Sequence, residues 1–249
     1  MRLVRCLLIV ALIPLTAAAT WPAAGDVRRT EADPLDYRRA LPTADVLIDV
    51  GHGGIDGGTH YGGILEKDIN LAVAKKLFLI LNSRGIITAL NRTGDYALSD
   101  ENRWHSARSR HRKDLSQRRQ LTREMQTGLL VSLHVNWSKN RSIRGPIVLH
   151  HESGESTMLA ASIQGTLNQQ QQSSKLPKLG RTFYLLRGEY NAVIVEMGFL
   201  SNDRDRAMLT DPVQQKAIAR AIADGICHYL WLVGGSNKFR HFHKPEIGS

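Results

Sequence analysis

Hydrophobic positions along the chain fall into short continuous runs and into longer segments with helical spacing. A continuous apolar run of about four to eight residues, bounded by glycine or polar turn residues, is typical of a strand that is buried on both faces. The runs that predict strands are 46–50, 86–90, 129–134, 146–151, 183–186 and 192–195.

Segments with helical spacing alternate with these runs. Val73 and Leu77 recur on one side of a predicted helix, and Gly85 ends it. Asp211 and Pro212 offer an N-cap acid and a first-turn proline to the last helix. The segments that predict helices are 67–83, 115–127, 157–172 and 212–232. Strands that alternate with helices predict an α/β fold, here a single domain with a mostly parallel twisted sheet flanked by helices.

The two ends of the chain differ from this middle part. Residues 1–19 combine a basic start with a short apolar run and small residues, which predicts a signal peptide or a membrane anchor. Residues 20–44 are rich in alanine, proline and charge and predict a linker. Residues 233–249 predict a basic flexible tail. The folded domain is therefore expected over 45–232.

Cysteine content and charge narrow the setting. Cys6 lies in the predicted signal segment, which leaves Cys227 alone, so no internal disulfide is expected and an exported protein of a bacterial surface fits best. The formal net charge of +10 suits an anionic surface such as a cell wall or lipid headgroups. Nucleic acid is not expected as a partner, since the charge is not interleaved with aromatics. The basic segment 103–123 has two interpretations: a solvated loop and helix face, or a surface that binds anionic wall polymer or a partner protein.

Polar residues that can take part in catalysis or metal binding follow three of the predicted strands. His52 comes after 46–50 in a glycine-rich loop, His134 ends 129–134, and Glu196 follows 192–195. Glu66 stands where the loop 51–63 gives way to the first helix. Because parallel strands end at the same edge of a sheet, these four side chains are expected to meet there.

Two histidines and one carboxylate make a typical open catalytic zinc site, which leaves a coordination position for water or substrate. His52, Glu66 and His134 are therefore candidate ligands of one Zn²⁺ per chain, and Glu196 is the candidate acid/base outside the ligand set. Each residue also has a simpler interpretation. His134 fits a hydrogen-bonded core histidine, Glu66 a helix-dipole acid, and Glu196 a paired structural carboxylate.

Four motifs together resemble one enzyme family. They are DVGHGGIDGG at 49–58, LEKDINL at 65–71, SLHVN at 132–136 and VEMGFLSN at 195–202. In this order they are similar to the type 3 N-acetylmuramoyl-L-alanine amidases, zinc enzymes that hydrolyse the amide between the lactyl group of N-acetylmuramic acid and the L-alanine of the peptidoglycan stem. The resemblance implies that His52, Glu66 and His134 bind the zinc and that Glu196 is the catalytic glutamate.

The resemblance carries further expectations about substrate and setting. Peptidoglycan is the expected partner, with Asn136 and Arg118 as candidate substrate-binding residues; Arg118 could instead pair with a buried acid. The stretch 108–118 is similar to the germination-specific amidases of spore-forming bacteria (the CwlD type). That similarity implies a role in spore cortex maturation and formation of muramic-δ-lactam, or in wall remodelling, and an accessory protein or lipoprotein activator. The expected location is extracytoplasmic, secreted or membrane-anchored at the envelope, including the space between forespore and mother cell.

Competing functions remain at this stage. One is a non-catalytic peptidoglycan-binding or regulatory protein with an amidase-like fold, and another is a metallopeptidase that cuts within the stem. His241 and His243 in the tail lack a frame to hold a metal, and His150 and His151 are expected at the surface.

Overall fold

The computed structural model describes residues 43–100, 109–125, 127–188 and 190–234. The predicted signal or anchor, nearly all of the linker, and almost the whole basic tail with its two histidines lie outside these residues. In the part that is described, no helix is both long enough and apolar enough to cross a membrane.

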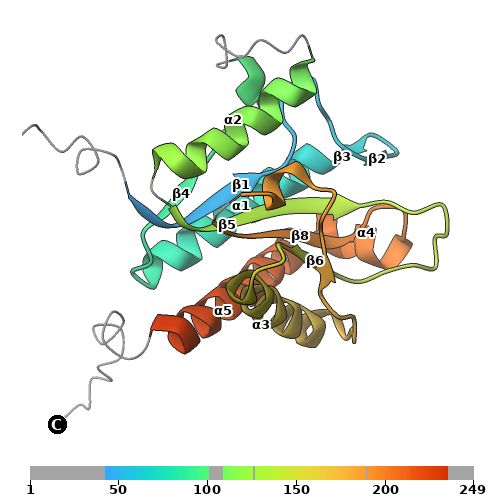
Figure 1. The fold of residues 1–249 in the computed structure, drawn as a ribbon. Coiled ribbons are helices and arrows are strands. Elements are labelled where there is room, and N and C mark those ends of the chain that lie inside the picture. Colours follow the sequence, from blue (N-terminus) through green and yellow to red (C-terminus); the bar gives the residue numbers. More distant parts are fainter. Residues whose placement is uncertain (1–42, 101–108, 126, 189, 235–249) are drawn as a thin grey trace, which may run out of the picture. The chain divides into compact units, whose positions relative to one another are not determined.

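A six-stranded sheet forms the centre of the fold (Figure 1), in the order β4-β1-β5-β8-β6-β7. Its strands are β1 (Ala44–Val50), β4 (Thr88–Leu90), β5 (Thr127–Asn136), β6 (Ile147–His150), β7 (Lys178–Leu179) and β8 (Asn191–Phe199). The first four strands in the order are mutually parallel, and β6 pairs antiparallel with β8. The predicted α/β fold with a mostly parallel sheet is confirmed.

Helices cover both faces of this sheet. α1 (Glu66–Ser83), α3 (Gly154–Gln171) and α5 (Pro212–Gly234) pack on one face, and α2 (Arg110–Glu124) lies on the other (Figure 1). The short α4 (Asp203–Thr210) follows β8, with the Asn202 side chain accepting a hydrogen bond from the Asp205 backbone N–H as its N-cap. The predicted helix 67–83 begins one residue earlier, at Glu66.

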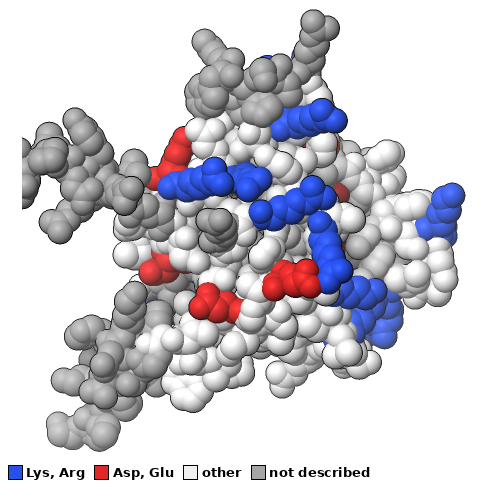
Figure 2. Space-filling view, in the orientation of Figure 1, with Lys and Arg blue, Asp and Glu red and all other residues white. Residues whose placement is uncertain are grey.

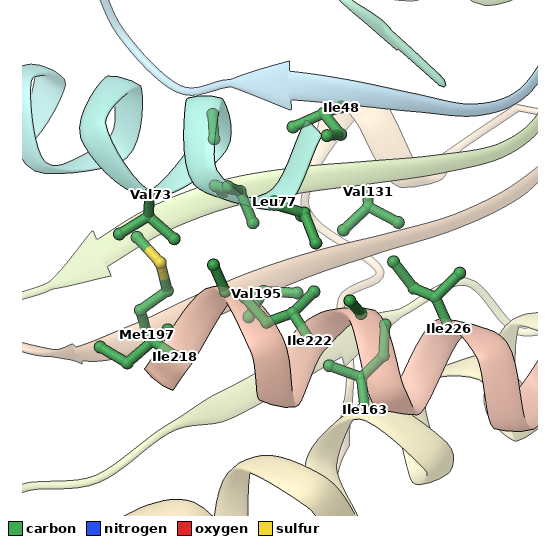
Figure 3. Close-up of a cluster of buried hydrophobic side chains, with 14 of the residues drawn as sticks. Ile48, Val73, Leu77, Val131, Ile163, Val195, Met197, Ile218, Ile222 and Ile226 are labelled. Carbon is green, nitrogen blue, oxygen red and sulfur yellow. The ribbon is translucent and has the colours of Figure 1, made fainter. Parts of the chain in front are cut away.

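The main hydrophobic core lies between the sheet and α1, α3 and α5 (Figure 3). Ile48, Val131 and Val195 from three adjacent strands contact Leu77 and Ile222 from the helices, and all are fully buried. Alternate positions of the same strands face α2, where a smaller cluster forms from Leu47, Leu130, Leu186, Ala192 and Ile194. Because strand side chains alternate between faces, this arrangement fixes which residues at each strand end face α2.

Three predictions about elements need correction. Residues 183–186 are not a strand: Tyr184–Leu186 is a 3₁₀ helix, η3, since only its two leucines are buried and β8 already pairs with strands on both sides. α2 begins at Arg110, earlier than predicted, because the Ser109 side chain caps the Arg112 N–H ahead of its apolar residues. His150 is not at the surface but buried, with Nδ1 2.8 Å from the His151 carbonyl oxygen.

A small hairpin that the pattern did not predict lies at the end of the glycine-rich loop 51–63. β2 (His60–Tyr61) pairs antiparallel with β3 (Ile64–Leu65). Gly62 and Gly63 turn the chain with φ of +53° and +84°, the left-handed pair that a two-residue hairpin turn requires. The hairpin ends directly at Glu66, so it leads the chain into the site described next.

Candidate metal centre

Four separate segments meet at the carboxyl edge of the parallel strands. His52 follows β1 by two residues, His134 lies near the end of β5, and Glu66 is the first residue of α1. Glu196 on β8 is the register partner of His134 on β5. Paired residues of adjacent strands project to the same face, about 5 Å apart, so Glu196 lies beside His134.

His52, Glu66 and His134 form a compact group of possible ligands. Their donor atoms all lie within 4.8 Å of one another. His52 Nε2 is 3.1 Å and His134 Nδ1 is 3.0 Å from Glu66 Oε1. The two imidazole rings meet edge to face with centroids 5.0 Å apart, which directs one nitrogen of each ring toward the carboxylate. The structure therefore brings together the three residues predicted as ligands.

The Glu66 carboxylate is fixed by backbone donors. Oε2 accepts from the Thr59 N–H at 2.8 Å, and Oε1 accepts from the Val135 N–H at 3.0 Å. Asn70, one turn further along α1, also donates to Oε1. These bonds come from the hairpin loop, β5 and α1, so Glu66 is held where those elements meet.

His52 adopts an uncommon backbone conformation. Its φ is +61°, which few residues other than glycine adopt. Its Nδ1 lies 2.9 Å from Asp56 Oδ2 in the same loop. A carboxylate acceptor at Nδ1 fixes the tautomer with Nε2 free as a ligand, as second-layer carboxylates do in zinc sites.

Glycine allows the loop to approach the site closely. A Cβ at Gly51 would lie 2.5 Å from His134 Cε1, and one at Gly58 would lie 2.6 Å from Glu66 Oε2. Both distances are too short for a side chain. The glycine-rich sequence is thus explained at these two positions by close contact with His134 and Glu66.

The charges of the group reinforce one another. Burial alone would raise the pKa of Glu66, but the hydrogen bonds of His134 and His52 outweigh it and hold that pKa well below its usual range. Burial would lower the pKa of His52, but its contacts with Glu66 and Asp56 raise it to about 9. Without a metal, His52 carries a proton at neutral pH, and a bound cation would replace that proton.

Glu196 has the opposite electrostatics. It is 9% exposed, and its Oε2 is buried without a hydrogen-bond partner among the described residues. Burial, together with the nearby charge of Glu66, raises its pKa to about 7, although the two histidines oppose the shift. A carboxyl group that titrates near neutrality and has an unused oxygen is suited to proton transfer.

This donor set fits zinc. Two imidazole nitrogens and one carboxylate oxygen, drawn from separate elements, are the ligand types of open catalytic zinc sites. The unpaired Glu196 oxygen beside them is expected where a further polar group, such as water, occupies the site.

Arg118, predicted either to pair with a buried acid or to reach the substrate, does the first. It is 3% exposed and forms ion pairs with Asp49 at 2.7 Å and Asp114 at 2.5 Å. Its two Nη atoms also donate to the carbonyl oxygens of Val50 and His52. A side chain enclosed in this way is not accessible to substrate.

Asn136 stays a prediction. It is half-buried two residues beyond His134, and its Oδ1 accepts from the Trp137 N–H at 2.7 Å.

The structure also shows residues that the sequence did not single out. Arg92 is fully buried and donates to the carbonyl oxygens of Val50 and Gly51. Only the contacts of Arg92 in the folded chain reveal this role. Asp56, in contrast, could have been noticed in the sequence, because it stands four residues after His52 in the same loop.

Comparisons with known proteins show the family of the chain. A family model described as N-acetylmuramoyl-L-alanine amidase matches residues 46–228. The germination-specific N-acetylmuramoyl-L-alanine amidase of Bacillus subtilis is 29% identical over 188 residues, which cover 74% of this chain and 79% of that protein.

Two solved structures are similar as well. The CwlD amidase from Clostridioides difficile, in complex with the GerS lipoprotein, superposes with a TM-score of 0.72 at 31% identity, covering 76% of this chain and all of that one. The catalytic domain of the CwlV amidase from Bacillus (Paenibacillus) polymyxa gives a TM-score of 0.65 at 28% identity, covering 74% and 97% of the two chains.

Proposed function

This chain belongs to the N-acetylmuramoyl-L-alanine amidase family and is an amidase, and from that premise we propose a zinc-dependent hydrolysis of peptidoglycan. The bond cleaved is the amide between N-acetylmuramic acid and L-alanine. His52, Glu66 and His134 would hold one zinc ion per chain, and Glu196 would be the acid/base.

One observation carries the proposal. Three donor atoms of the right kinds lie within 4.8 Å of one another, beside a buried carboxyl group with a pKa of about 7. The simpler interpretations do not explain this arrangement. A helix-dipole acid does not explain why two histidines contact Glu66 Oε1. A paired structural carboxylate does not explain why Glu196 Oε2 has no partner among the residues that the structure describes.

The chain's own residues divide the chemistry between them. When bound, zinc supplies a Lewis acid that polarises the amide carbonyl and makes water more acidic. Glu196 takes the proton of the attacking water as the new C–O bond forms. As the C–N bond breaks, Glu196 returns that proton to the departing alanine nitrogen and regains its starting state. Its pKa near neutrality suits both transfers.

Digestion of purified peptidoglycan, followed by mass analysis of the products, tests this function. We expect intact peptides that begin with L-alanine, and we expect a chelator to stop their release. Glu196→Gln should retain zinc but lose turnover by a factor of about 10²–10⁴. Products cut within the stem would indicate a metallopeptidase, and full activity of Glu196→Gln would exclude the proposed role of that residue.

The biological setting is proposed from the relatives. The Bacillus subtilis relative is germination-specific, and the Clostridioides difficile structure contains a lipoprotein partner. We infer a role in spore cortex maturation for this chain, outside the cytoplasm, with an accessory lipoprotein. Muropeptide analysis of spores that lack the protein tests this, since muramic-δ-lactam should be missing from their cortex.

A further inference from the structure

Two buried arginines hold the end of β1, and one of them reaches a metal ligand. Arg92 donates to the carbonyl oxygens of Val50 and Gly51. Arg118, from α2, donates to Val50 at 2.7 Å and to the carbonyl oxygen of His52 at 2.9 Å. Arg118 therefore connects a helix on the α2 face of the sheet directly to the backbone of a candidate ligand.

His52 needs this support because of its conformation. With φ at +61°, its backbone lies in a region where a residue with a Cβ is strained, and such a residue persists only when its surroundings hold it. Besides the contact of its Nε2 with Glu66, two contacts restrain it: Asp56 at ring Nδ1 and Arg118 at the carbonyl oxygen. The contact with Asp56 fixes the orientation of the imidazole ring. The contact with Arg118 fixes the position of the His52 backbone, and thereby the point from which the side chain extends toward Glu66.

Arg118 is itself locked in place. Asp114, one turn earlier on α2, accepts from Nε, and Asp49 on β1 accepts from Nη1. Asp49 also accepts hydrogen bonds from Ser132 on β5 and from Asn91 after β4. The guanidinium thus lies in a network that joins three strands and α2, with its second Nη left for His52.

The described residues of α2 bury little apolar surface. Its fully buried residues are Gln117, Arg118 and Thr122, all polar, and Leu121 is only partly buried against the smaller cluster. A helix with so little buried apolar surface depends on its polar contacts for its position. Arg118 therefore contributes both to the packing of α2 on the sheet and to the position of His52.

We propose that Arg118 is a positioning residue of the metal centre, which acts through the backbone of His52. The proposal deepens the proposed function, because it assumes that His52, Glu66 and His134 bind zinc. It assigns Arg118 no contact with substrate.

Electrostatics alone predicts the opposite effect of Arg118 on metal affinity. A guanidinium cation near the site repels Zn²⁺, so removing it, and leaving the Asp49 carboxylate unneutralised, should tighten binding. If Arg118 positions His52, removing it should weaken binding instead. The sign of the change separates the two explanations.

The test is zinc affinity of the metal-free full chain, measured by competition with a chromophoric chelator. We expect Arg118→Met to weaken binding about 10- to 100-fold, as loss of other second-layer partners does. Arg118→Lys restores the charge but not the forked geometry and should remain several-fold weaker than wild type. Tighter or unchanged zinc binding by Arg118→Met would overturn the proposal.

Arg119→Met is the matched control. Arg119 is the next residue of α2; its guanidinium stacks on Tyr184 at 5.2 Å and donates to the Arg187 carbonyl oxygen, away from β1. The control removes the same charge from the same helix, and its zinc affinity should stay within about twofold of wild type. An equal loss in both variants would contradict a role specific to Arg118.

A second measurement on the wild-type chain applies even where Arg118 variants fail to fold. Bound zinc stabilises the whole fold and so protects every amide that exchanges only by global unfolding. Because coupling between two sites is reciprocal, saturating zinc should in addition slow the α2 amides that exchange by local opening. The locally opening amides of α3, which packs on the other face of the sheet, serve as reference. Equal slowing of the locally opening amides in both helices would argue against the coupling. If the wild type binds no zinc at all, the proposed function fails and not merely the role of Arg118.

Discussion

Glu196 shows how one residue combines a structural cost with a chemical use. Its carboxyl group is buried on β8 beside His134, and one oxygen has no partner among the described residues. Burying an ionised carboxylate in this way destabilises the fold, so the group holds its proton up to a pH of about 7. The residue that destabilises the metal-free chain is the one we expect to transfer protons.

The stability of the metal-free protein should therefore depend on pH through Glu196. The unfolded chain loses this proton near its ordinary value of 4.5 and the folded chain near 7, so the free energy of unfolding should fall as pH rises between these values. The loss is about 3 kcal/mol at most. Urea denaturation at pH 5 and pH 7.5 measures it, and Glu196→Gln should lack this component. The same pH dependence in both proteins would show that Glu196 is not the group responsible.

The sequence predicted which polar side chains converge better than it predicted the residues that hold them in place. His52, His134 and Glu196 were visible because each follows an apolar run, and the ends of parallel strands meet. The sequence did not reveal the roles of Arg118 and Arg92, since the partners of a buried arginine depend on contacts between residues far apart in the chain. The metal roles themselves stay predictions until zinc is measured.

At the scale of elements, the approach of β1 to β5 determines the site. The Gly51 N–H donates to the Leu133 carbonyl oxygen at 3.1 Å, and a Cβ added at Gly51 would collide with the His134 ring. No side chain fits between the two strand ends. The spacing of these strand ends, and not only the identity of the ligands, is thus required for the histidines to converge.

Gly51→Ala should therefore damage the metal centre. The added methyl would lie 2.5 Å from His134 Cε1 and 2.6 Å from the Leu133 carbonyl oxygen, so His134 or the strand end must move. We expect at least a tenfold loss of zinc affinity and a loss of about 1–3 kcal/mol in stability.

The matched control is Gly165→Ala on α3. A Cβ there meets no atom within 4 Å, and alanine favours helix over glycine by up to about 1 kcal/mol. Thermal unfolding and zinc titration of both variants provide the comparison. A Gly51→Ala protein that binds zinc as tightly as wild type would contradict this account of β1 and β5.

Element prediction succeeded where periodicity was strong. α1 and α5 have long apolar stripes, and both were predicted to within two residues of their bounds. α2 was misplaced at its start because residues 110–114 are all polar or charged, and helix capping by Ser109 decides its first turn. The strand predicted at 183–186 failed because a short apolar run does not distinguish a strand from a 3₁₀ turn.

At the scale of the whole molecule, the layer order could be predicted but the direction of every strand could not. Alternating elements predicted α/β and a mostly parallel sheet, which is confirmed. Antiparallel pairing of β6 with β8 had no local signal, since strand direction depends on the path of the connection after β5.

The net positive charge is also a property of the whole molecule. Figure 2 shows Lys and Arg side chains gathered across the face that carries α2, where Arg110, Arg112 and Arg123 are exposed. With a formal net charge of +10, the protein should be attracted to anionic wall material over a range that salt shortens.

Binding to insoluble peptidoglycan should accordingly depend on ionic strength. Raising NaCl from about 0.05 to 0.5 M should weaken sedimentation with purified sacculi about tenfold, because exposed charges are then screened. A variant with Arg110, Arg112 and Arg123 all changed to Gln should bind less at low salt and depend less on salt. If salt has no effect, binding rests on uncharged contacts and the basic face is only a solvated surface.

The wide separation of the ligands along the chain has a thermodynamic consequence. His52, Glu66 and His134 come from three separate segments, a loop, a helix and a strand, that approach one another only in the native state. An unfolded chain cannot present them together, so every bound ion adds to the free energy of unfolding, by about 2.7 kcal/mol when free zinc is at one hundred times its Kd. Zinc supply would then set the Tm and the protease resistance of this protein as well as its turnover, and starvation for the metal would reduce its abundance along with its activity.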